Sequence, residues 1–369
     1  MSPAEVATLA GPTTLEGATV AFDVGPVIAT PTGVGRYARE LARALEVRGV
    51  SLTPYAVALR GRTDPSVARW RLPARAVQSA WRTFGSPVIE HLVGDVDIVH
   101  ATNFVLPALK RAAGVVTIHD LSFVRNGTFP GGARLRELVP WSARRAARVI
   151  APTQAVADEI TVELAIDPET ISVTREGVSA VFFGATPLAS SALETMGIRP
   201  PFAVAAGTLE PRKNLPRLLQ AWGQVADEMS EWTLVLAGPP GWGPELPETP
   251  RVVLTGWIGD ETLPGLLSAA EFFCYPSLYE GFGLPPLEAM AAGTPVLAGN
   301  YPCASEVLGE DALIVDSHST ETIAQGLLRL ASDSDLRRKL GYRGRARAAE
   351  NTWERTATQT LQAYEAALD

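Results

Sequence analysis

Short apolar runs alternate with amphipathic stretches through the first half of the chain. Residues 18–24 (ATVAFDV) are typical of a buried parallel strand. Residues 35–49 then place Tyr37, Leu41 and Leu45 on one face, which predicts a helix. The alternation continues with strands expected at 51–58, 96–100, 114–118, 147–151 and 171–174, and with helices at 134–146 and 154–165. Strands that alternate with helices indicate a parallel sheet covered on both faces.

A second series of strands and helices fills the rest of the chain. It follows residues 184–200, which are rich in small residues and turn formers and which we expect to be the interdomain linker. Its expected elements are a helix at 214–227 and strands at 202–206, 233–237, 251–254, 271–275, 294–298 and 312–315. The pattern predicts an α/β protein with two Rossmann-like domains, 1–185 and 186–351, and a ligand cleft between the carboxyl ends of their strands.

The last segment, 352–369, is an amphipathic stretch that predicts a helix. Its expected buried side carries Trp353, Leu361, Tyr364 and Leu368. The pattern alone does not say which domain the helix covers.

Composition and charge narrow the classes of function. The 369 residues are 46% hydrophobic and 20% charged, which fits two packed domains. The net charge of −8 argues against nucleic-acid binding, which needs a basic surface. The charge is uneven: residues 1–185 carry 19 Lys and Arg against 17 Asp and Glu (+2), and the remainder carries 13 against 23 (−10), which suggests different partners.

The cysteine content and the amino-terminal segment indicate a cytoplasmic protein. Cys274 and Cys303 match neither a metal motif nor a disulfide scaffold. Residues 1–16 lack the basic start and the long apolar run of a signal peptide or membrane span, and we expect them to be a loose leader.

The stretch 275–298 carries the strongest chemical signal. Glu280 lies in a glycine-containing loop, and Glu288 lies in the first two turns of a helix that the proline pair of LPPLEAMAAG opens. Free N–H groups at a helix start attract phosphate, whereas carboxylates accept hydrogen bonds from sugar and ribose hydroxyls. A solvated acidic turn is the structural alternative, but the glycines beside Glu280 favour a binding loop.

A second cluster, GTLEPRKN at 207–214, follows the expected strand 202–206. Arg212 and Lys213 would stand at the carboxyl edge of the sheet, where two cations can bind a diphosphate. A solvated turn is the alternative reading of a single Arg-Lys pair, and the position at the edge of a parallel sheet favours binding.

Three motifs, EGFGLPPLEA, GTLEPRKN and GVGRYARELA, together resemble family 4 glycosyltransferases of the GT-B architecture in their order and spacing. TIHDL, APTQAVADEI and REGVSAVF extend the resemblance from about residue 18 to the end. It implies two facing Rossmann-like domains, the first for the acceptor and the second for a nucleotide sugar, with helix 352–369 crossing back to the first. The motifs look most like those of bacterial mannosyltransferases and related polysaccharide-building enzymes.

The resemblance implies a donor site in the second domain. Arg212 and Lys213 would bind the donor diphosphate and neutralise the leaving nucleotide. Glu280 would hold the transferred sugar, and Glu288 would bind the ribose. Many relatives carry arginine where this chain has Thr208, so Arg212 would supply that charge instead. Further donor contacts are expected from Trp257 and Ile258 at the nucleobase, and from Gly281, Phe282, Gly283 and Leu284 near the sugar.

Other contacts are expected from the first domain. Gly33 and Gly35 would form a loop that closes on the phosphates, where a side chain would obstruct approach. His119 would lie beside the sugar, and Asp120 would orient His119 or contact the acceptor. His100 also stands at a strand end and is expected as a second cleft residue, without support from the resemblance.

The resemblance implies transfer with retention of anomeric configuration and without a metal cofactor, the leaving diphosphate assisting deprotonation of the acceptor. The D-x-D strings at 95–97 and 333–335 do not favour a metal site, because the first ends a loop and the second is typical of a helix N-cap at Asp333. GDP-mannose is the favoured donor, a UDP-sugar is the alternative, and the acceptor is expected to be a glycan or lipid-linked molecule.

Residues 60–82 combine six arginines with two tryptophans and one aspartate. One interpretation is peripheral contact with anionic lipid, or with a lipid-linked acceptor, at the inner face of the membrane. The other is a solvated basic helix whose arginine stems cover apolar surface. The sequence leaves both open.

Two other functions also stay open at this stage. GVGRYA fits the G-x-G-x-x-A fingerprint of an NAD-dependent oxidoreductase, but its glycines begin nine residues after Val24, and strand 51–58 has no acidic end for a ribose. Loss of Glu280, Glu288 or Lys213 would suggest a non-catalytic sugar-nucleotide-binding protein, but all three are present.

Overall fold

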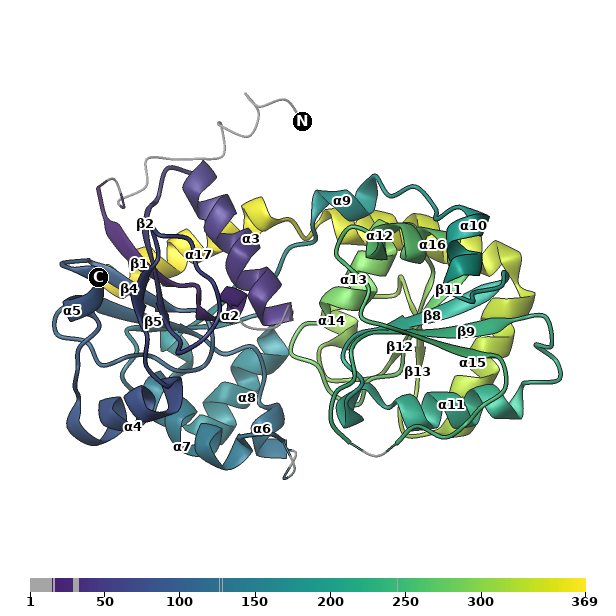
Figure 1. The fold of residues 1–369 in the computed structure, drawn as a ribbon, viewed down its shortest axis with the longest axis horizontal. Coiled ribbons are helices and arrows are strands. Elements are labelled where there is room, and N and C mark those ends of the chain that lie inside the picture. Colours follow the sequence, from purple (N-terminus) through teal and green to yellow (C-terminus); the bar gives the residue numbers. More distant parts are fainter. Residues whose placement is uncertain (1–14, 16, 29–32, 126, 128, 244) are drawn as a thin grey trace. The chain divides into compact units, whose positions relative to one another are not determined.

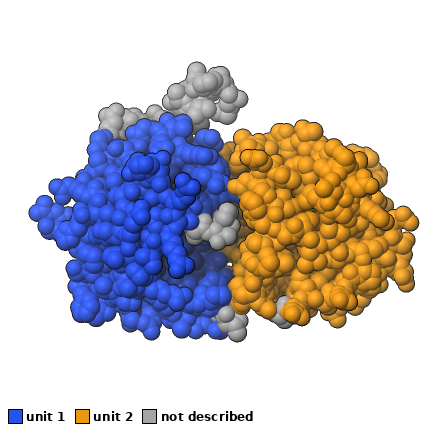
Figure 2. All heavy atoms as spheres, viewed as in Figure 1, with its two compact units in different colours: residues 1–175, 353–369 blue, residues 176–352 orange. Residues whose placement is uncertain are grey.

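The computed structural model describes residues 15, 17–28, 33–125, 127, 129–243 and 245–369. Contacts divide the chain into two compact units (Figure 2). Unit 1 comprises Met1–Arg175 and Trp353–Asp369, and unit 2 comprises Glu176–Thr352. The leader expected at 1–16 lies outside the described residues, Leu15 excepted.

Unit 1 is built on a seven-stranded parallel sheet with the order β3-β2-β1-β4-β5-β6-β7 (Figure 1). The strands are β1 (Thr19–Asp23), β2 (Ser51–Val57), β3 (Ala68–Trp70), β4 (Ile98–Ala101), β5 (Ala113–Thr117), β6 (Arg148–Ala151) and β7 (Ile171–Val173). The helices are α2 (Gly25–Ile28), α3 (Gly33–Val47), α4 (Ala74–Phe84), α5 (Glu90–Val93), α6 (Ser122–Arg125), α7 (Gly132–Ala143), α8 (Gln154–Leu164), the short 3₁₀ turn η1 (Pro168–Thr170) and α17 (Trp353–Leu368).

Side chains of the inner strand β1 alternate between two layers of helices. Val20 packs with Tyr37 of α3 and Tyr364 of α17, whereas Ala21 packs with Trp81 of α4. Because successive strand residues point to opposite faces, α3 and α17 cover one face of the sheet and α4 covers the other. The direction in which successive strands are added reverses between β1 and β4, which makes this the topological switch point of the sheet. In Rossmann-like sheets, ligands bind at the carboxyl ends of the strands at such a point.

Unit 2 is built on a six-stranded parallel sheet with the order β10-β9-β8-β11-β12-β13. The strands are β8 (Phe202–Ala206), β9 (Thr233–Ala237), β10 (Val252–Gly256), β11 (Phe272–Tyr275), β12 (Val296–Gly299) and β13 (Leu313–Val315). The helices are α9 (Ala180–Phe183), α10 (Ser190–Thr195), the 3₁₀ turn η2 (Pro211–Lys213), α11 (Leu215–Gln224), α12 (Leu263–Ala269), α13 (Leu284–Ala291), α14 (Ala304–Leu308), α15 (Thr320–Ser332) and α16 (Ser334–Ala349). Here the order turns between β8 and β11, so the segments after these two strands leave the sheet side by side.

The chain passes between the units earlier than the sequence pattern suggested. The division falls between Arg175 and Glu176 rather than at 185/186. Residues 184–200 are not a linker, because they contain α10, bury Leu193 and Ile198, and bond the N–H of Leu188 to the carbonyl of Gly265 inside unit 2. Small residues and turn formers therefore marked a packed surface segment.

Three local expectations also differ from the structure. Gly33 and Gly35 were expected to form a loop, but α3 already begins at Gly33, so both glycines lie in a helical turn. The basic stretch 60–82 contains strand β3 as well as helix α4. On α17, Trp353, Leu361 and Tyr364 are buried as expected, but Leu368, the last residue of the helix, is 45% exposed. Within the described part of the chain, no helix has the length and apolar character required to cross a bilayer.

Candidate active site

Two segments that follow neighbouring strands of unit 2 bring charged side chains together. The turn η2 after β8 carries Arg212 and Lys213, and the loop after β11 carries Glu280. A small cavity beside Lys213 is lined in part by Gly207, Thr208 and Tyr275. The sequence therefore placed these charges correctly at the carboxyl edge of the sheet, and the topology explains why they meet.

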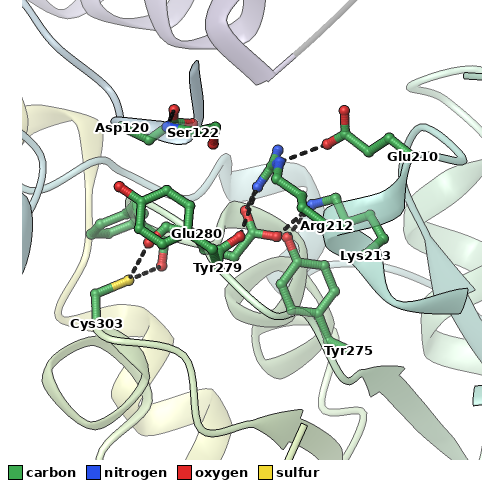
Figure 3. Close-up of polar contacts among 10 residues, drawn as sticks. Asp120, Ser122, Glu210, Arg212, Lys213, Tyr275, Tyr279, Glu280 and Cys303 are labelled. Carbon is green, nitrogen blue, oxygen red and sulfur yellow. Dashed lines mark hydrogen bonds and ion pairs between the residues drawn. The ribbon is translucent and has the colours of Figure 1, made fainter. Parts of the chain in front are cut away.

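Glu280 is shared by both cations (Figure 3). The Lys213 ammonium donates to Glu280 Oε1 at 2.9 Å and also to the Tyr275 hydroxyl. The Arg212 guanidinium donates to Glu280 Oε2 and to the carbonyl of Tyr279 at 3.2 Å, and its Nε pairs with Glu210 Oε1 at 2.7 Å. Two positive charges thus face two carboxylates over a few ångströms.

This cluster is largely shielded from water, which strengthens its electrostatics. Glu280 is 4% exposed and Lys213 is 9% exposed. Burial by itself raises the pKa of Glu280, but the charges of Arg212 and Lys213 outweigh it and lower that pKa from 4.5 to about 2. Burial and the nearby charge of Arg212 lower the pKa of Lys213, and Glu280 opposes them. Burial and the charge of Glu280 raise the pKa of Tyr275, so its phenol stays protonated at neutral pH.

Glycines let the backbone approach closely around the cluster. Gly207 has φ +135°, and a Cβ placed on Gly238 would lie 1.9 Å from the Gly207 carbonyl oxygen, so no side chain fits there. Gly283 has φ +96° and caps the start of α13. Cys303 donates from Sγ to the Glu280 carbonyl at 3.2 Å, which ties the loop to the segment before α14.

The remaining predicted donor residues follow strands β10 and β11 of unit 2, and they differ in exposure. Pro285 and Pro286 open α13 as expected, and Glu288 in its second turn is 3% exposed. Trp257 and Ile258 directly follow β10, and the Trp257 ring is 56% exposed. Gly281, Phe282 and Gly283 of the loop are buried, and so is Leu284, the first residue of α13.

In unit 1, His119 lies just beyond β5 and is 7% exposed. Its Nε2 lies 2.9 Å from the carbonyl oxygen of Thr102, and because a carbonyl only accepts, Nε2 carries the proton. Asp120 accepts the N–H of Ser122 through Oδ1 at 2.8 Å, which begins α6.

The structure corrects the expectation for His100. Its side chain is fully buried in the centre of the unit 1 sheet, with Nδ1 2.7 Å from the Tyr364 hydroxyl and Nε2 2.8 Å from the Thr117 hydroxyl. Burial, with a smaller contribution from His119, lowers the pKa of His100 to about 3, so it is neutral. His100 is a core residue rather than a cleft residue.

Sequence reasoning overlooked Tyr275, Glu210 and Asp23. Tyr275 and Glu210 flank the motif residues, yet only the adjacency of β8 and β11 shows that they contact the cations. Asp23 ends β1 at the turn in strand order, where burial raises its pKa to about 6 although the N–H of Gly25 lowers it. Its position at the end of an apolar strand was the available signal.

Neither D-x-D string acts as an isolated carboxylate pair. Asp97 accepts the N–H and the hydroxyl of Thr19 at 2.8 and 2.9 Å, which joins β1 to the approach of β4. Asp333 accepts the N–H of Leu336 at 2.8 Å and caps α16, as the sequence predicted. Both carboxylates therefore have structural roles.

Comparisons with known proteins agree with this architecture. Residues 31–181 match the family model described as Glycosyltransferase Family 4, and residues 197–347 match the one described as Glycosyl transferases group 1. The O-antigen chain mannosyltransferase B of Escherichia coli is 30% identical and aligns over 94% of this chain and 99% of its own.

Two solved structures illustrate the similarity of fold. Sucrose-phosphate synthase from Thermosynechococcus elongatus superposes with a TM-score of 0.73 at 20% identity, covering 94% of this chain and 98% of that one. Anabaena HepE in complex with UDP-glucose gives a TM-score of 0.70 at 18% identity, covering 93% of this chain and 99% of that one.

Proposed function

The chain belongs to family 4 of the glycosyltransferases and has the GT-B fold, and from this premise we propose its reaction. It transfers a hexose from a nucleoside-diphosphate sugar to a hydroxyl of a glycan or lipid-linked acceptor, with retention of anomeric configuration. GDP-mannose is the favoured donor, in line with the mannosyltransferase relative, and a UDP-sugar is the alternative. The observation that carries the proposal is the buried cluster of Arg212, Lys213 and Glu280.

In the proposed donor site, Arg212 and Lys213 bind the diphosphate. They follow β8, which pairs with β11, and two preorganised cations stabilise the charge that develops on the leaving nucleotide. Thr208 lines the same cavity, where its hydroxyl can donate to a phosphate oxygen while Arg212 supplies the charge. A diphosphate would therefore compete with Glu280 for the two cations.

Glu280 then serves the transferred sugar, because its carboxylate oxygens accept hydrogen bonds from hydroxyl groups. Glu288 binds the ribose from α13, and the segment Trp257–Ile258 contacts the nucleobase. The neighbouring backbone completes the proposed sugar site through Gly281, Phe282, Gly283 and Leu284.

The first domain supplies the acceptor side in this proposal. His119 contacts the sugar, Asp120 orients His119 or contacts the acceptor, and Gly33 and Gly35 offer the phosphates a surface without side chains at the start of α3. During transfer, the bond from the anomeric carbon to the phosphate oxygen breaks as the acceptor oxygen bonds on the same face. The acceptor proton passes to the leaving diphosphate, so charge and protons balance without a metal ion.

We also propose contact with a membrane through 60–82, but fewer residues of this segment can take part than the sequence suggested. Trp81 is buried in the core, and Arg69 donates to the carbonyls of Ala58, Arg60 and Gly61, so neither reaches lipid. Leu72 is 46% exposed and Phe84 is 77% exposed beside exposed arginines, a combination suited to an anionic bilayer surface. Family membership does not favour an NAD-dependent oxidoreductase, and the intact charge cluster does not favour a non-catalytic protein.

The proposal is tested by calorimetric binding of GDP, UDP, ADP and NADH in EDTA. We expect one nucleoside diphosphate to bind selectively, and the matching nucleotide sugar to be turned over with the acceptor pool of a bacterial membrane extract. Binding of NADH alone would point to a dehydrogenase. Binding that requires added Mg²⁺ would reject metal independence.

A further inference from the structure

A chain of buried polar side chains crosses unit 1 and ends against His119. Tyr364 on α17 bonds to His100 on β4, His100 bonds to Thr117 on β5, and the Thr117 hydroxyl lies 3.1 Å from the hydroxyl of Tyr37 on α3. All four side chains are at most 1% exposed. Four elements that are distant in sequence thus meet in one continuous network.

The network ends in a ring contact with His119. The Tyr37 ring lies 4.8 Å from the His119 ring, centroid to centroid, at an interplanar angle of 86°. Phe104 adds a second perpendicular ring at 6.1 Å. The hydrogen bond from Nε2 to Thr102 fixes one point of the imidazole, and the two perpendicular rings restrict its rotation about that bond. The flanking rings define its plane.

An apolar core would be the simpler way to join α17 to the sheet. Burying hydroxyls and an imidazole costs free energy unless each finds a partner, and a fully satisfied polar network selects one arrangement of side chains. Here His100 is neutral, so one ring nitrogen donates and the other accepts, and both neighbours are hydroxyls that fit either tautomer. The network can therefore hold Tyr37 in a single orientation.

We propose that Tyr37 is a positioning residue for His119, and that Tyr364 of the C-terminal helix holds Tyr37 in place through His100 and Thr117. The inference rests on the proposed function in so far as His119 acts on substrate. It gives α17 a role beyond covering the sheet, because the helix sets the orientation of a site residue that lies on another element.

The closing experiment reads His119 directly. The chain has four histidines, so histidine labelled with ¹³C and ¹⁵N gives few ring signals, which His→Asn variants assign. We expect Tyr364→Phe and Tyr37→Phe, which keep every ring around His119 but break the chain of hydroxyl bonds, to shift or broaden the His119 ring signals, and Tyr37→Leu, which also removes the flanking ring, to change them most. Leu361→Ala, which removes a buried side chain of α17 in the same core, is the matched control and should leave His119 unchanged. Unchanged His119 signals in folded Tyr364→Phe and folded Tyr37→Phe would overturn the inference.

Turnover supplies an independent measurement in a double-mutant cycle. Tyr37→Leu should lower kcat about tenfold, with little change in KM for the donor, because a misplaced group costs chemistry more than binding. In a His119→Ala background the same change should have no further effect, since positioning acts through His119. Additive effects would overturn the inference, whereas full activity of His119→Ala alone would instead reject the proposed role of His119.

Discussion

At the residue scale, Glu280 links the two halves of the proposed donor site, because one carboxylate holds both Arg212 and Lys213. Replacing Glu280 with Gln keeps the size and removes the charge, which frees both cations for phosphate. We expect Glu280→Gln to bind the sugar-free nucleoside diphosphate about tenfold more tightly, since charge-assisted bonds contribute on the order of 1.5–3 kcal/mol. Turnover of the nucleotide sugar should fall at the same time. Calorimetry with GDP and UDP measures the first effect.

The neighbouring carboxylate provides the control for this prediction. Glu210→Gln removes a charge that pairs with Arg212 alone, so its gain in affinity should be smaller. Lys213→Ala should weaken binding. Weaker binding by Glu280→Gln than by the wild type would show that Glu280 orders the cations rather than competing for them.

Asp23 leads to a prediction of pH-dependent stability. Its pKa is raised to about 6 from 3.8, so ionisation destabilises the folded state above pH 6 and the penalty vanishes below about pH 4. Asp23→Asn should therefore raise the free energy of unfolding by about 3 kcal/mol at pH 7 and leave it nearly unchanged near pH 4. Urea denaturation at the two pH values measures this difference.

Asp97 is the matched control, because hydrogen bonds from Thr19 lower the pKa of its carboxyl. Asp97→Asn should reduce stability at pH 7, opposite in sign to Asp23→Asn. If Asp23→Asn also reduces stability at pH 7, burial of Asp23 is compensated by contacts that the charged form needs.

The residue scale also shows what sequence motifs can predict about the site. Arg212, Lys213 and Glu280 stood out because their spacing and glycines are local signals. Tyr275 did not, since its hydroxyl meets Lys213 only when β8 and β11 lie side by side, and that adjacency depends on contacts between distant segments.

At the scale of elements, the pattern predicted most strands because a buried parallel strand is a continuous apolar run. β8 and β9 have the expected bounds, whereas β3 was missed because an edge strand of three residues leaves no run to detect. In α4 the arginines obscured the apolar face formed by Val77 and Trp81, four residues apart. Gly33 and Gly35 were read as a loop because glycine disfavours helix interiors, a preference that matters less in a first turn.

The surface around α4 supports a membrane-binding prediction. Arg62 and Arg71 are exposed, and each arginine near an anionic surface contributes about 1 kcal/mol. Arg62→Gln with Arg71→Gln should weaken binding to phosphatidylglycerol vesicles at least tenfold in a sedimentation assay. The control pair, Arg43→Gln with Arg338→Gln, changes exposed arginines on α3 and α16 and should bind normally. Absence of wild-type binding to these vesicles would contradict membrane contact.

At the scale of the whole molecule, sequence alternation predicted two α/β halves but placed their boundary by composition. The contacts that decide the boundary are long-range: Arg175 bonds to Gln359 and Thr356 of α17, whereas Val178 bonds to Asn351 within unit 2. No local pattern encodes these pairings. The amphipathic pattern of 352–369 likewise predicted helix α17 but not its position. That α17 packs in the core of unit 1 depends on long-range contacts, and only the resemblance implied it.

Because α17 contributes Trp353, Leu361 and Tyr364 to one core, and the core of unit 2 is formed by other residues, each unit should respond separately to a local change. Leu361→Ala should cost about 2–5 kcal/mol and lower the unfolding temperature of unit 1 in scanning calorimetry. The nucleoside diphosphate that binds, GDP or UDP, should instead raise the transition of unit 2, since binding to a folded state stabilises it. If both changes move a single transition, the two units unfold cooperatively, and binding of the nucleoside diphosphate is coupled to the stability of unit 1.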